Sequence, residues 1–156
     1  MNYRITFFLF LFSTGLMAQT SPGYWQQRVE YQLDIRLDDQ TNAVQGREKL
    51  KYYNHSQDTL RRVFFHLYWN AFQPNSAYAK WAEHTKDFAT NKKLFDLKPE
   101  EIGKQEIFSV QQNGNAVSYR VNETIMEVEL SRPLKPGDYD VFDIAWQGQV
   151  PMAIKR

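Results

Sequence analysis

Residues 29–37 of this 156-residue chain read VEYQLDIRL, and every second residue from Val29 to Leu37 is apolar. Strict alternation over this length is typical of a strand that buries one face and exposes the other to water. The turn-forming cluster DDQTN (38–42) comes next, and a second alternating run occupies residues 44–52. The two runs predict a long β-hairpin, with Gly46 as a candidate bulge in its second strand.

Strand patterns recur along most of the remaining chain. A third strand is predicted over residues 60–69, and the last third holds further alternating runs, with the hairpin dipeptide Asn113-Gly114 between two of them. Residues 70–106 are instead polar and helix-compatible, and KPEEIG (98–103) has the residues of a short helical turn. The prediction is a mainly β fold, an antiparallel β-sandwich or saddle-shaped sheet with a short helical elaboration near residues 76–104.

The N-terminus predicts export. Residues 1–18, MNYRITFFLFLFSTGLMA, have a positive start, a short apolar stretch and small residues before Ala18, which is the pattern of a signal peptide. Residues 19–156 are then a single β domain without a membrane span, in a secreted or periplasmic protein. Because the chain contains no cysteine, it has no disulfide framework, and a bacterial origin is the expectation.

The charge balance excludes one class of partner. The net charge is +1, and the basic pairs Arg61/Arg62 and Lys92/Lys93 are short and isolated. Phosphate backbones are bound by larger clusters of lysine and arginine. No nucleic-acid partner is therefore expected.

The aromatic stretch FFHLYWNAFQ (64–73) raises the question of a ligand or metal site around His66. If residues 62–69 form a strand, both of its faces carry rings, which predicts a central strand covered on both sides. Phe64, Phe65 and Trp69 are then core residues, and His66 is packed and hydrogen-bonded. A zinc ligand would need companions at metal spacing, and none accompanies His66.

No catalytic, cofactor-binding or metal residue is predicted in this chain. The zinc-peptidase signature H-E-x-x-H is absent, since the three histidines begin HSQDT, HLYWN and HTKDF. The sequence also lacks G-x-S-x-G and the glycine loops that bind phosphates and dinucleotides. The many carboxylates nominate no pair for glycoside hydrolysis.

Five blocks of the sequence carry a resemblance to a known family. They are YWQQRVEYQLDIRLD (24–38), HLYWNAFQPNS (66–76), LKPEEIG (97–103), VQQNGNAVSYRVNETIMEVEL (110–130) and KPGDYDVFDIAWQGQVP (135–151). The chain resembles the N-terminal β domain of secreted M1-family metallopeptidases, the zinc aminopeptidase group, of the Bacteroidetes type. The resemblance implies a saddle-shaped β domain that packs against a catalytic domain holding the zinc, and that catalytic domain is absent from this chain.

The expected function follows from that resemblance. It is a non-catalytic scaffold domain that braces a metallopeptidase catalytic domain encoded downstream and lines its peptide cleft. The peptide substrate would meet this chain only through that domain, and the chain alone is predicted to be inactive. The alternative is a free-standing secreted β-sandwich that binds a glycan or a protein through exposed aromatic residues such as Tyr24, Trp25, Tyr78 and Trp81.

Overall fold

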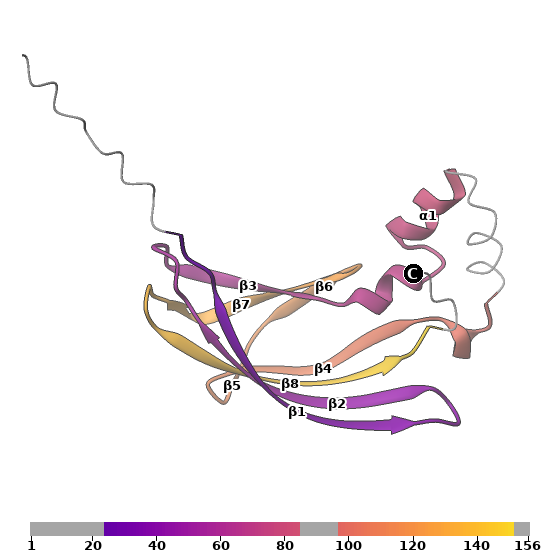
Figure 1. The fold of residues 1–156 in the computed structure, drawn as a ribbon, viewed down its shortest axis with the longest axis horizontal. Coiled ribbons are helices and arrows are strands. Elements are labelled where there is room, and N and C mark those ends of the chain that lie inside the picture. The colour runs from indigo at the N-terminus through magenta and orange to yellow at the C-terminus, as the bar shows by residue number, and fades with distance from the viewer. Residues whose placement is uncertain (1–23, 85–96, 152–156) are drawn as a thin grey trace, which may run out of the picture.

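The computed structural model describes residues 24–84 and 97–151, and they form two antiparallel sheets (Figure 1). The larger sheet has the strand order β1-β2-β8-β4-β5, and the smaller has the order β3-β7-β6. The strands are β1 (Arg28–Asp38), β2 (Ala43–Tyr53), β3 (Leu60–His66), β4 (Lys104–Gln112), β5 (Asn115–Ala116), β6 (Tyr119–Asn122), β7 (Ile125–Leu134) and β8 (Tyr139–Gln149). The predicted mainly β, antiparallel fold is confirmed.

Two of the three helices lie within the elaboration predicted near residues 76–104, of which residues 85–96 lie outside the described residues, and the third begins earlier, in the end of the predicted third strand. The 3-10 helix η1 (Tyr68–Phe72) follows β3, the helix α1 (Ala77–His84) comes next, and the 3-10 helix η2 (Pro99–Glu101) precedes β4. Ser76 caps α1, because its hydroxyl accepts a hydrogen bond from the backbone N–H of Ala79 at 3.0 Å. None of the helices in the described part of the chain has the length and apolar character that a membrane crossing requires.

The predicted hairpins are confirmed. β1 and β2 pair without interruption from Arg28 opposite Tyr53 to Asp38 opposite Ala43. At the other hairpin, Asn113 and Gly114 adopt φ values of 50° and 81° between β4 and β5. Positive φ at both central residues is what a tight two-residue hairpin turn requires.

The core lies between the two sheets. Leu50, Phe142 and Ile144 of the larger sheet meet Val63, Met126 and Val128 of the smaller one, and all six are at most 3% exposed. The rings of Phe65 and Phe142 pack edge to face across this space, with centroids 5.9 Å apart. We call the core-bearing face of the five-stranded sheet its inner face and the opposite one its outer face.

The bulge predicted at Gly46 is wrong. β2 keeps a continuous register with both β1 and β8 through this residue. Gly46 instead makes room for Trp146, its partner on β8, because a Cβ atom at position 46 would lie 2.4 Å from the indole ring. The glycine therefore allows the indole of Trp146 to pack against the backbone of β2, and the strand stays regular.

The prediction for the third strand is also wrong in part. β3 ends at His66 and is an edge strand of the smaller sheet, in which β7 is central. Nothing in the described part of the chain covers its outer side, so Phe64 is 60% exposed and His66 is exposed as well. Phe65 does pack on the core, and Trp69 in η1 packs against Gly148. Rings on both faces of a strand do not require that both faces be covered.

We expect Gly46→Ala to destabilise the domain by about 1–3 kcal/mol, because the new methyl group overlaps the indole of Trp146. Urea unfolding measures the change. The double variant Gly46→Ala/Trp146→Ala is the control, since removal of the ring removes the overlap. Equal costs of the glycine substitution with and without the ring would contradict this role of Gly46.

A buried carboxylate joins three segments at one end of the sheets. Asp140 on β8 is 0% exposed, and it accepts hydrogen bonds from Gln112 and Asn113 at 2.6 Å and from Arg132 at 2.7 Å. These donors lie on β4, in the β4–β5 turn and on β7. Of the three donors only Gln112 is buried, and loss of the carboxylate would take one hydrogen-bond partner from its amide, which is more costly than the net value of the bond.

Asp140→Ala should accordingly lower the free energy of unfolding by about 2–3 kcal/mol. The matched control is Asp143→Ala on the same strand, which removes a surface carboxylate 3.6 Å from the ammonium of Lys49. Such an exposed pair is worth less than about 1 kcal/mol. Comparable losses in the two variants, measured by urea unfolding, would show that the buried network is not the stabilising element.

Candidate functional site

The described residues hold no group of three or more His, Asp or Glu side chains that could bind a metal ion. His55 lies in the turn after β2, with its Nδ1 3.0 Å from the carbonyl of Gln26. His84 ends α1, with its Nδ1 2.7 Å from the carbonyl of Lys80. The ring of His66 stacks on that of Tyr68, with centroids 5.0 Å apart and an interplanar angle of 6°. The residues that the structure describes thus do not fit a zinc site.

An apolar row on β1 faces inward without being buried. Tyr31 pairs with Leu50, so Tyr31 and the residues at every second position after it lie on the inner face. These side chains are between 52% and 63% exposed. In Figure 1 the turn end of the β1–β2 hairpin lies away from the three-stranded sheet, in agreement with this exposure. We call these residues the β1 row: Tyr31, Leu33, Ile35 and Leu37.

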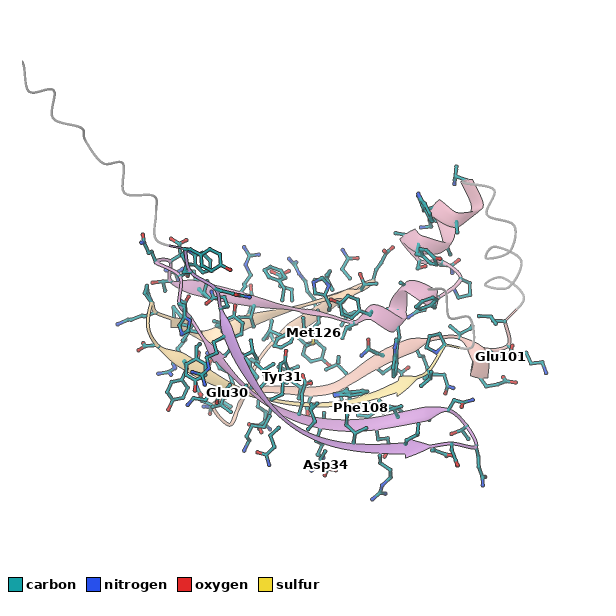
Figure 2. The ribbon with its side chains drawn as sticks, viewed as in Figure 1. Glu30, Tyr31, Asp34, Glu101, Phe108 and Met126 are labelled. Carbon is teal, nitrogen blue, oxygen red and sulfur yellow. The ribbon has the colours of Figure 1, made fainter. Side chains whose placement is uncertain are left out.

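The exposure of the β1 row corrects one expectation from the sequence. The alternation of β1 predicts a half-buried strand with one wet face, and the strand is confirmed. Its apolar face, however, is open to solvent over most of its length in this chain. Figure 2 shows Tyr31 on the side of β1 toward the three-stranded sheet and Asp34 on the opposite side.

A hollow of about 300 Å³ opens between the two sheets next to the β1 row. This inner-face hollow is lined by rings and by one carboxylate, and its wall includes Tyr31, Glu48, Phe65, Tyr68, Met126 and Trp146. Its volume is at the lower end of the range of small-molecule sites. The rings come from β1, β3, η1 and β8, so both sheets and the elaboration build this hollow.

Glu48 is the unusual member of the hollow. It pairs with Leu33 on β1 and Ile144 on β8, so it lies on the inner face among apolar neighbours. Within the described residues its carboxylate has no hydrogen-bond or ion-pair partner, and burial raises its pKa. Burial, and after it the charge of Glu48, raise the pKa of the Tyr31 phenol. The sequence could have indicated this site, because Glu48 is the one acidic residue among the alternate positions 44, 46, 48, 50 and 52, which all lie on the inner face. The sequence prediction did not include it.

The outer face of the larger sheet is different in character. It forms a broad, shallow groove of about 590 Å³ lined mainly by outer-face residues such as Asp34, Arg47 and Gln111. Leu33, Glu48 and Ile144, whose side chains the register places on the inner face, also border it. Opposite charges alternate there, and Lys49 lies 3.6 Å from Asp143. On the outer side of the smaller sheet, Arg62 and Arg120 both bind Glu127. Lys49, Arg62 and Arg120 therefore each have a carboxylate partner on these outer faces.

The aromatic residues of the alternative function lie at two places. Tyr24 and Trp25 precede β1 and are 91% and 49% exposed. Tyr78 and Trp81 lie on α1 and stack on each other, with centroids 6.0 Å apart. Tyr78 is half-buried, which corrects the expectation that it is exposed. In Figure 1 the start of β1 and the helix α1 lie at opposite ends of the molecule, so the two pairs do not form one platform for a sugar.

Comparison with known proteins gives a result for the fold. The chain is similar to a two-domain M1 zinc metallopeptidase bound to L-arginine, with 17% identity, a TM-score of 0.52 and coverage of 83% of this chain and 22% of that one. A form bound to L-tryptophan gives 17% identity and a TM-score of 0.52, over 85% of this chain and 23% of that chain. The chain is also similar to the M1 zinc metallopeptidase from Deinococcus radiodurans bound to a Tyr-Ser-Ala substrate. The identity is 17% and the TM-score 0.51, over 82% of this chain and 22% of that one.

No family model and no curated protein matches the sequence. The structural matches nevertheless cover most of this chain, whereas the chain spans about a fifth of the length of those metallopeptidases. The resemblance noted in the sequence is thus confirmed for the fold. This chain has the fold of one β-rich part of an M1 zinc metallopeptidase.

Proposed function

We propose that this chain is the non-catalytic N-terminal domain of an M1-type zinc aminopeptidase, which braces the catalytic domain and lines one side of its peptide cleft. The fold match supports the family, and its partial coverage supports a role as one part of a larger enzyme. In this proposal the zinc ligands and the residues that activate water come from the catalytic domain. A peptide substrate therefore meets this chain only within the assembled enzyme.

The single observation that carries the proposal is the exposure of the β1 row. Full burial of a Leu or Ile side chain is worth about 1.5–3 kcal/mol, and each member of the row leaves about half of this gain unrealised. A contiguous apolar strip of this kind marks a contact surface. The row also lies on an edge strand, whose outer backbone groups have no strand partner in the described sheet. A partner domain that covers this strip would recover the missing burial.

The partner in this proposal is the catalytic domain encoded downstream in the same reading frame. Its docking can be tested by co-expressing this chain with that segment, purifying the pair and measuring their affinity. We expect Leu33→Asp/Ile35→Asp to weaken binding at least about tenfold, because two charges would then be buried without partners. Zinc-dependent aminopeptidase activity of the pair should fall in parallel.

The matched control changes the other face of the same strand. Asp34→Lys/Arg36→Glu alters charges on the outer face and should leave the affinity within about threefold, a small change in binding free energy. A downstream region without H-E-x-x-H would refute the proposal, and so would zinc-dependent peptide cleavage by this chain alone. A soluble monomer whose behaviour does not depend on the β1 row would favour the free-standing binder instead.

Export is part of the same proposal. Residues 1–18 lie outside the described residues, and the signal-peptide pattern of their sequence supports a secreted or periplasmic location. We expect the exported protein to begin at Gln19, as measured by mass spectrometry of the mature N-terminus. Replacement of the apolar residues 7–10 by Asn or Gln should keep the protein in the cytoplasm. A mature protein that retains Met1 at its N-terminus would contradict this assignment.

A further inference from the structure

The inner-face hollow contains a negative charge that the described protein does not neutralise. Glu48 points to the inner face between Leu33 and Ile144, and no described residue gives its carboxylate a hydrogen bond or an ion pair. Of the side chains that line the hollow, none belongs to a lysine or an arginine. His66 also lines it, but the ring of His66 stacks on Tyr68. A half-buried carboxylate without a counter-charge is costly.

The walls around Glu48 are aromatic. Trp146 lies over Gly46, two residues from Glu48 on the same face of β2, because the glycine leaves space for its indole. Tyr31 contributes a phenol that responds to the charge of Glu48, and Phe65 and Tyr68 close the other side of the hollow. Ring faces carry partial negative charge, and Trp and Tyr attract cations most strongly.

We infer that the inner-face hollow binds an organic cation, an alkylammonium or guanidinium group, whose charge pairs with Glu48 while its apolar atoms pack on Tyr31, Tyr68 and Trp146. The same chemistry is offered by a free small cation and by a Lys or Arg side chain of a peptide. The hollow's volume of about 300 Å³ suits a group of this size. This site lies within the described chain and goes beyond the scaffold role, on which it does not rest.

The choice of a cation follows from the two properties of the wall taken together. An aromatic hollow alone would accept any apolar group, and a carboxylate alone on a surface would remain hydrated. Their combination favours a charge that is large, weakly hydrated and surrounded by carbon atoms. An anionic ligand would meet both the carboxylate and the negative ring faces, so it is disfavoured.

The test uses the purified chain and two probes of the same shape, tert-butylammonium and tert-butanol, in a series of buffers from neutral to mildly alkaline pH. The pH is varied because burial raises the pKa of Glu48 and a higher pH favours its ionised form. Titration followed by the indole N–H resonance of Trp146 gives both affinities. We expect tert-butylammonium to bind about tenfold more tightly than tert-butanol, and Glu48→Gln to abolish this difference. Equal affinities of the two probes for the native chain would overturn the inference.

Glu129→Gln is the matched control, because it removes an exposed strand carboxylate that does not line the hollow. It should leave the difference between the probes unchanged, and an equal loss in both variants would refute a specific site. Since burial raises the pKa of Glu48, its ionised form costs folding free energy, so Glu48→Gln should melt no lower than the native chain. Loss of binding therefore cannot be ascribed to unfolding if the melting temperature holds.

A second experiment distinguishes a free cation from a Lys or Arg side chain of a peptide as the ligand. An extended peptide with a central Lys or Arg is compared with the same peptide carrying norleucine or citrulline there. Tighter binding of the charged peptide than of tert-butylammonium, with the same dependence on Glu48, supports the inference with a peptide side chain as ligand. Equal affinity of the charged peptide and tert-butylammonium, with that dependence, supports it with a free cation as ligand. Binding of either charged probe that survives Glu48→Gln contradicts the inference.

Discussion

The pairing of β2 with β1 on one side and β8 on the other is the constraint on which the rest of the structure depends. Both registers run without a shift over the whole length of β2. Because side chains alternate between the two faces of a strand, a slip of one residue in either pairing would transfer every apolar side chain to the wrong face. The core, the β1 row and the inner-face hollow all follow from this register.

The same register explains why the inner face is divided into two regions. Over Leu50, Phe142 and Ile144 it is covered by the three-stranded sheet and forms the core. The cover ends toward the edge strand β1 and toward the β1–β2 turn. Tyr31 lies level with Leu50 and Phe142 in the register, yet it is 60% exposed. The sheet is therefore longer than the layer that packs on it. As a result, the larger sheet is packed on one part of its inner face and open to solvent on the other.

Much of the fold could be predicted from the sequence, because local patterns specify it. Alternation gave the long strands, and Asn113-Gly114 gave a turn whose φ values only a few residue types tolerate. What could not be predicted depends on which strand lies beside which. The exposure of Phe64 and His66 follows from the edge position of β3, and the openness of the β1 row follows from the limited extent of the smaller sheet. The hollow could not be predicted, because its walls come from residues that are distant in the chain. The only indication in the sequence was Glu48, an acidic residue at a position that the alternation of β2 places on the inner face.

The packing of the Trp146 indole on Gly46 has a consequence for the comparison of sequences. The two residues are 100 positions apart in the chain, yet the size of one limits the size of the other. Among proteins with this fold, a side chain at the position of Gly46 should therefore occur together with a smaller residue at the position of Trp146. Where overall identity is as low as 17%, a correlated pair of this kind is a more specific signature of common ancestry than the alternating patterns, which many β proteins share.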